Sequence, residues 1–232
     1  MEVVNITENV FQITLPNVNV FLIVHPVGLI LIDTGPKDSK DSIFEGIRKI
    51  GKQPEDLKAI ILTHAHYDHA GSLAAILETV QVPVYASALC AEMIKKGIAF
   101  KTSSKVVAFL LKLITLSGRI RSTYINVQEV KSPIITVNEG DWIPDESGLQ
   151  VYNAPGHTAE QLALFYPVKE ALLFAADCAE NTKKLKLKPV IAYQSIKLSR
   201  QTLKKLAALP FIIVVFGHGE AVIKEKFEEM FA

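Results

Sequence analysis

The chain has 232 residues, a length that suits one sizeable domain, and we expect a single domain over residues 1–232. Hydrophobic residues make up 49% of the chain and charged residues 21%, a composition that excludes an intrinsically disordered protein. The 25 lysines and arginines nearly balance the 24 aspartates and glutamates. No overall positive charge therefore favours nucleic acid as a partner.

The N-terminal sequence and the apolar runs bear on location. The first residues lack the basic and apolar regions of a signal peptide. No apolar stretch reaches the roughly 18 residues that a membrane span needs. Two cysteines, Cys90 and Cys178, stand too far apart for a Cys-x-x-Cys zinc site or a disulfide framework, and we expect buried thiols. We expect a cytoplasmic protein with no membrane partner.

Short apolar and β-branched runs predict strands in both halves of the chain. In the first half they cover residues 10–15, 19–24, 29–32, 59–63 and 83–86. In the second half they cover residues 124–130, 134–137, 149–153, 162–166, 171–174 and 211–216. Helical patterns cover residues 43–50, 94–120 and 195–209, with further helices after Gly71, Ser87 and Gly219. Strands followed by helices in each half predict two halves packed sheet to sheet.

Three histidines and an aspartate follow the predicted strand 59–63 within six residues: His64, His66, Asp68 and His69. In an extended segment the first three of these side chains point to the same side. Imidazole and carboxylate are preferred ligands of zinc, iron and manganese. Such groups are costly to gather at a strand end unless a cation compensates them, so the cluster predicts a metal site.

Three more residues of the same kind lie just past other predicted strands. His157 follows the turn after residues 149–153, Asp177 follows residues 171–174, and His218 follows residues 211–216. Because ligand sites are common at strand ends, we expect these side chains to join the first cluster.

These segments resemble those of the metallo-β-lactamase fold hydrolases. The resemblance is carried, in chain order, by Ile32-Asp33-Thr34-Gly35, by Thr63 to Ser72, by Ala154 to Thr158, by Ala176-Asp177 and by Gly217-His218-Gly219. It covers nearly the whole chain and implies an α/β fold, a four-layer αβ/βα sandwich with the site at one edge of the two sheets. One departure is Ala175-Ala176-Asp177, where many relatives have glycine before the aspartate.

The resemblance also implies a role for each residue. One metal would be held by His64, His66 and His157, and a second by Asp68, His69 and His218, with Asp177 bridging both. Asp33 would brace the ligand loop through hydrogen bonds. The cofactors implied are two divalent metal ions, zinc in the first place, with iron or manganese as alternatives.

Two such cations would supply a bound hydroxide as the nucleophile and would polarise the bond under attack, while Asp68 could act catalytically by passing a proton to the leaving group. The bridging carboxylate resembles the glyoxalase II-like and lactonase-like branches, so the sequence predicts hydrolysis of a small ester, thioester or lactone. Two alternatives share the motif: a mononuclear-iron oxidoreductase of the sulfur dioxygenase type, and a phosphodiesterase.

Three further features are weaker signals. Tyr193 is a possible substrate contact. The apolar residues of 99–120 could line a pocket for a small-molecule substrate or pair with a second copy in a homodimer, and plain core packing is an equal alternative. The basic run 183–188 could meet an anionic substrate, although such runs are usually only solvated.

Overall fold

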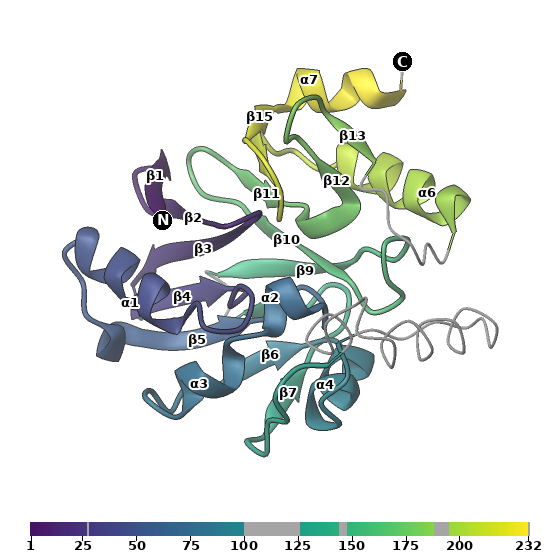
Figure 1. Cartoon of the computed structure of the whole chain (residues 1–232). Helices are drawn as coiled ribbons and strands as arrows, with labels where there is room; N and C mark the ends of the chain where they lie inside the picture. Colours follow the sequence, from purple (N-terminus) through teal and green to yellow (C-terminus); the bar gives the residue numbers. More distant parts are fainter. Residues whose placement is uncertain (27, 100–125, 144–147, 188–194, 232) are drawn as a thin grey trace.

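The computed structural model describes residues 1–26, 28–99, 126–143, 148–187 and 195–231. In this part of the chain two β-sheets face each other and helices cover their outer sides (Figure 1). This arrangement is the αβ/βα sandwich that the sequence predicted.

The first sheet has seven strands, numbered in the order in which they lie side by side. They are β1 (Glu2–Thr7), β2 (Val10–Leu15), β3 (Val18–His25), β4 (Gly28–Ile32), β5 (Leu57–Ile61), β6 (Val84–Ala86) and β7 (Ile134–Thr136). Strands β1 to β4 form an antiparallel meander, and β4 to β7 pair in parallel. The carboxyl ends of β4 and β5 therefore meet at one edge of the sheet.

The second sheet has six strands in the order β15-β14-β11-β10-β9-β8. Their bounds are β8 (Trp142–Ile143), β9 (Leu149–Asn153), β10 (Leu162–Tyr166), β11 (Leu172–Phe174), β14 (Ile213–Val215) and β15 (Val222–Ile223). A separate hairpin consists of β12 (Ala179–Glu180) and β13 (Lys186–Leu187).

Helices separate and cover the strands. They are α1 (Lys40–Lys49), η1 (Pro54–Asp56), α2 (Tyr67–Ala70), α3 (Leu73–Leu77), α4 (Ala88–Lys95), η3 (Ala176–Cys178), α6 (Ile196–Ala207), α7 (Lys224–Glu228) and η4 (Glu229–Phe231). Figure 1 shows α1, α3 and α4 beside the first sheet and α6 and α7 beside the second. Among the residues described, no helix is long and apolar enough to cross a membrane.

Alternation along the strands builds three apolar layers. In β4, Leu29 and Leu31 pack in the layer under α1, α3 and α4. Ile30 and Ile32 point the other way, into the layer between the two sheets. A third layer joins the outer side of the second sheet to α6 and α7. The continuous apolar runs in the sequence reflect burial on both faces of these strands.

Most predicted strands are confirmed, but the strand predicted at 124–130 is wrong for the residues described. Asn126 forms only an isolated bridge with Ile98, and Val127 donates its backbone N–H to the carbonyl of Gly97. The strand that pairs with β6 at this end of the sheet is β7. Residues 127–130 instead form a loop that contacts the chain just after α4.

The helix predicted over 94–120 also needs correction. Helix α4 begins after Ser87, whose hydroxyl accepts the N–H of Cys90, and it ends at Lys95. Gly97 follows with φ of +66°, a left-handed conformation that favours glycine and ends a helix. Residues 100–120 of this prediction lie outside the described residues.

Candidate metal centre

Loops that follow strands of both sheets deliver the predicted ligands to one place. The segment after β5 carries His64, His66, Asp68 and His69, and its last part forms the short helix α2. The other loops carry His157 after β9, Asp177 in η3 after β11, and His218 after β14. The structure thus brings together all seven residues that the sequence singled out as ligands.

Their donor atoms form three overlapping groups, within each of which the atoms lie no more than 4.8 Å apart. The groups are His64, His66 and His157; His64, His69 and Asp177; and Asp68, His69 and His218. The first and third groups are the two ligand sets that the resemblance implied. The middle group links them through Asp177.

The Asp177 carboxylate lies between the two sets. Its Oδ1 atom is 3.4 Å from His69 Nε2, and its Oδ2 atom is 3.3 Å from His157 Nε2 and 3.4 Å from His218 Nε2. Asp68 lies at the more open side, with its Oδ2 atom 3.5 Å from His218 Nε2. One carboxylate therefore faces donor atoms from both sets.

Three histidines are held through their Nδ1 atoms. His64 Nδ1 lies 3.0 Å from Thr63 Oγ1, His69 Nδ1 lies 2.8 Å from Asp33 Oδ2, and His218 Nδ1 contacts the backbone carbonyl of Asn17. The Nε2 atoms of these three rings are left to face the other ligand-type side chains of the site. Within the described part of the chain they have no hydrogen-bond partner.

Buried donor atoms without partners are costly unless an unseen group satisfies them. His64 and His69 are fully buried, and Asp177 is 2% exposed. The Oδ1 atom of Asp177 also has no hydrogen-bond partner among the residues described. Imidazole and carboxylate donors converging in this way suit divalent cations such as zinc. The residues present therefore fit the metals that the resemblance implied.

The protonation states differ from ring to ring. Burial lowers the pKa of His64 well below its usual range, and the neighbouring His69 and His66 lower it further. Burial also acts to lower the pKa of His69, but the carboxylates of Asp177 and Asp33 raise it well above its usual range. Without a metal, His64 is therefore neutral and His69 is in its charged, doubly protonated form. A cation that binds His69 would have to displace one of its two protons.

The same contacts hold the pKa of the Asp177 carboxyl well below its usual range. Burial opposes this shift, and the charges of His69, His218 and His157 outweigh it. Asp177 is therefore ionised and suited to bind cations.

Two glycines let the loops approach closely. A β-carbon on Gly217 would lie 2.4 Å from Asp177 Oδ1 and 2.6 Å from His69 Cε1. A β-carbon on Gly156 would lie 2.4 Å from Ser199 Oγ of helix α6, which packs behind the His157 loop. Both glycines are needed because atoms of these neighbouring residues occupy the space that a β-carbon would fill.

Asp33 lies at the end of β4 and contacts the ligand loop, which is the place that the resemblance implied for it. It accepts hydrogen bonds from the backbone N–H of Thr63, from the Thr63 hydroxyl and from His69 Nδ1, each at 2.8 Å. Its neighbour Thr34 donates its N–H and its hydroxyl to the carbonyl of His69. These hydrogen bonds join the end of β4 to the segment that follows β5.

Other sequence predictions fall only partly on residues that the structure describes. Tyr193 and most of the segment 99–120 lie outside the described residues, and their predicted roles stay predictions. In the basic run, Lys183 and Lys184 are exposed, and Lys186 pairs with the buried Glu180 at 2.8 Å. Solvation and one ion pair account for this part of the run.

Sequence reasoning missed three residues near the ligands. Thr63 belongs to the quoted motif, so its position beside His64 was the available signal. Asn17 acts through a backbone carbonyl, which leaves no signal in the sequence. Glu160 is 6% exposed, and burial raises the pKa of its carboxyl. Its backbone carbonyl accepts the Ser87 hydroxyl at 2.8 Å, which joins the His157 loop to the start of α4.

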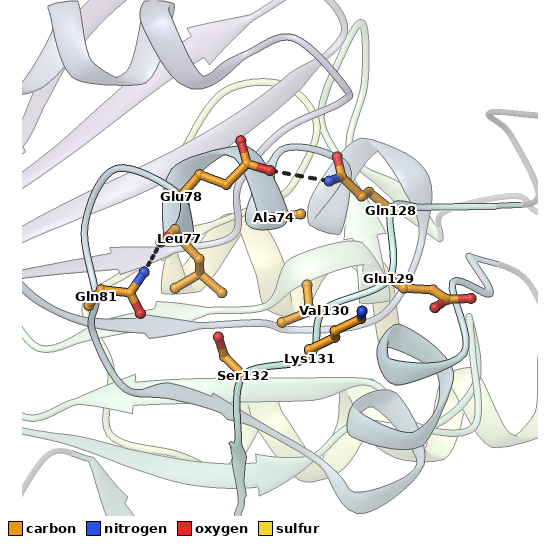
Figure 2. Close-up of a pocket in the computed structure, with 9 residues that line it drawn as sticks. All are labelled: Ala74, Leu77, Glu78, Gln81, Gln128, Glu129, Val130, Lys131 and Ser132. Atoms are coloured by element: carbon orange, nitrogen blue, oxygen red, sulfur yellow. Dashed lines mark hydrogen bonds between the residues drawn. The ribbon is translucent and has the colours of Figure 1, made fainter.

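A cavity of about 340 Å³ lies apart from this site (Figure 2). It is lined by Ala74, Leu77, Glu78, Gln81, Gln128, Glu129, Val130, Lys131 and Ser132. Gln128 Nε2 donates to Glu78 Oε1 at 3.4 Å across it. None of the seven ligand-type residues lines this cavity.

The chain is similar to known proteins over most of its length. The family model of the metallo-β-lactamase superfamily matches residues 13–218. The probable metallo-hydrolase YqjP of Bacillus subtilis is 27% identical, with 96% of this chain and 77% of that protein covered. An N-acyl homoserine lactonase of Bacillus thuringiensis is 25% identical, with 77% of this chain and 62% of the lactonase covered.

A solved structure gives the same fold. A metallo-β-lactamase from Cronobacter sakazakii superposes with a TM-score of 0.71 at 21% identity, covering 94% of this chain and 78% of that one. At this level of identity the likeness shows the fold alone.

Proposed function

Because the chain belongs to the metallo-β-lactamase superfamily of metallo-hydrolases, we propose that it hydrolyses a small ester, thioester or lactone with two divalent metal ions, zinc in the first place. The observation that carries the proposal is the position of Asp177. Its two carboxylate oxygens lie 3.3–3.4 Å from histidines of both ligand sets. A carboxylate in this place suits a pair of cations better than a single one.

The residues that would hold the metals are those of the two sets. His64, His66 and His157 would hold one ion, and Asp68, His69 and His218 the other, with Asp177 shared. When bound, such ions supply a nucleophile by lowering the pKa of a water, and they polarise the oxygen of the substrate.

The chain's own residues would prepare the site for this chemistry. The loops that carry His64, His69 and Asp177 bury these side chains almost completely, which excludes water from behind the donors. The side chain of Asp68 is 20% exposed and reaches the open side. A carboxyl group there would be placed to transfer a proton to the leaving group of a substrate entering from solvent.

Two observations support the substrate class. The relative that matches 77% of this chain is an N-acyl homoserine lactonase. The near balance of 25 basic and 24 acidic residues provides no broad positive surface for a polynucleotide. A small ester, thioester or lactone is consistent with both observations.

The test begins with the metal content of the purified protein, followed by a substrate screen on zinc-loaded protein. The screen contains carboxylic esters, thioesters, lactones and phosphodiesters, and oxygen uptake is followed with a thiol substrate. The same screen on His66→Ala shows whether turnover belongs to this site. The exposed Asp41→Asn on α1 serves as the control, and we expect wild-type activity from it.

We expect two metal ions per chain and turnover of at least one ester, thioester or lactone that His66→Ala abolishes. Phosphodiester turnover without any acyl-bond turnover would contradict the substrate class. One iron per chain with oxygen consumption would contradict hydrolysis itself.

A further inference from the structure

Thr63, which lies between β5 and the metal centre, forms hydrogen bonds with each of its polar groups. Its N–H donates to Asp33 Oδ1 at 2.8 Å, and its carbonyl accepts the N–H of Leu162 from the second sheet at 2.8 Å. Its hydroxyl lies 2.8 Å from Asp33 Oδ2 and 3.0 Å from His64 Nδ1. Thr63 is 1% exposed, so solvent does not compete for these bonds.

The direction of each bond follows from counting protons. The Asp33 carboxylate can only accept, so the single proton of the Thr63 hydroxyl goes to Asp33. The hydroxyl oxygen is then an acceptor for His64 Nδ1, which must carry the N–H. A neutral ring with its single N–H on Nδ1 keeps a lone pair on Nε2, the atom that has no hydrogen-bond partner among the described residues.

The Thr63 hydroxyl favours one of the two neutral tautomers of His64. It lies 3.0 Å from His64 Nδ1, whereas Nε2 has no hydrogen-bond partner among the described residues. Without the hydroxyl, the Nδ1–H would lose this acceptor, and the Nε2–H tautomer would no longer be disfavoured. That tautomer places hydrogen on the atom that must bind a metal.

We propose that Thr63 is a positioning residue whose hydroxyl fixes His64 as the Nδ1–H tautomer and couples the two ligand sets through Asp33. Asp33 Oδ2 accepts both the Thr63 hydroxyl and His69 Nδ1–H. His64 belongs to one ligand set and His69 to the other. One hydrogen-bonded chain of four side chains therefore orients a donor for each metal.

The inference rests on the metal site of the proposed function but not on its substrate. Its first test uses the metal-free protein and nitrogen-15 NMR of the histidine rings, with the His64 signals assigned by comparison with His64→Gln. We expect His64 as the Nδ1–H tautomer in the wild type and in Thr63→Ser. We expect a shift toward Nε2–H in Thr63→Val.

The second test measures both metal affinities by competition with a chromophoric chelator. We expect Thr63→Val to weaken at least one binding step about 10–100-fold, the usual loss when a residue that orients a ligand is removed. Thr63→Ser, which keeps the hydroxyl, should remain close to the wild type. The control is Thr7→Val, the same substitution at a buried threonine of β1, and it should leave both affinities unchanged.

Two results would overturn the inference. One is a wild-type His64 in the Nε2–H form, which needs no variant and so does not depend on Thr63→Val folding. The other is a folded Thr63→Val that binds both metals as tightly as the wild type. A wild type that binds no divalent cation would instead contradict the proposed function, and the tautomer of metal-free His64 would still decide the role of Thr63.

Discussion

Replacing Asp33 by asparagine tests the bracing of the ligand loop with an almost isosteric change. The carboxylate accepts three hydrogen bonds at 2.8 Å from buried donors, two on Thr63 and one on His69. An amide has one oxygen acceptor and a donating NH₂ group. Whichever way the amide points, the NH₂ group faces a donor that the carboxylate satisfied.

The expected loss follows from this mismatch. One buried donor left without an acceptor costs about 1–3 kcal/mol. In a chain of this size each kcal/mol lowers the melting temperature by roughly 2–4 °C. Asp33→Asn should therefore melt several degrees lower. Asp33→Ala, which leaves three donors without acceptors, should lose about 3 kcal/mol or more.

The asparagine variant should lose metal as well as stability. With NH₂ opposite His69 Nδ1, two N–H donors face each other, and the ring loses the contact that orients its Nε2 atom toward Asp177. We expect metal affinity to fall about 10–100-fold. Melting is followed by circular dichroism on metal-free protein, and affinity by chelator competition. Asp41→Asn, on the exposed side of α1, is the matched control. A folded Asp33→Asn with wild-type melting and metal affinity would refute the bracing role.

Three further predictions concern the same site. At matched metal loading, Asp177→Ala should lose more activity in the substrate screen than Asp33→Ala, because Asp177 faces both ligand sets. Metal affinity measured by chelator competition should rise as the pH is raised above the usual pKa of histidine, since the raised pKa of His69 means that a cation must displace its proton; a flat profile would contradict this. Ala176 has φ of +47°, where a β-carbon costs roughly 1–2 kcal/mol, so Ala176→Gly should not lower the free energy of unfolding in urea. Ala179→Gly, in an extended strand conformation, should lower it by about 0.5 kcal/mol or more.

The ligands of the candidate site could be predicted because their signal is local. An apolar run such as Leu29–Ile32 is buried on both faces of its strand and has to end where polar residues begin. Asp33 follows that run, and His64 to His69 follow the next one. Parallel pairing of β4 with β5 then brings both ends to one edge of the sheet. The ends of the apolar runs were sufficient to pick out these residues, and the parallel pairing is what the structure adds.

The segment 126–130 shows where local patterns fail. Val127 and Val130 are β-branched, as is common in strands, but a strand also needs a neighbour with free backbone groups. Strand β7, only four residues later, pairs with β6. The carbonyl of Gly97 accepts the N–H of Val127 instead. Competition between segments for one sheet edge depends on the whole fold, and no window of sequence contains it.

The residues that orient the ligands could be predicted only in part. Thr63 and Asp33 act through side chains, so their residue types beside the ligand motif carried a signal. Asn17 acts through its backbone carbonyl, which any residue type possesses, and it lies 201 positions before His218. What Asn17 contributes is its place in the tight turn between β2 and β3, where φ is +68° and asparagine is tolerated. The sequence can therefore identify the groups that would bind a metal, and it can identify the side chains that orient them. It cannot identify a backbone acceptor, because that role is assigned by the packing of the turn against the His218 loop.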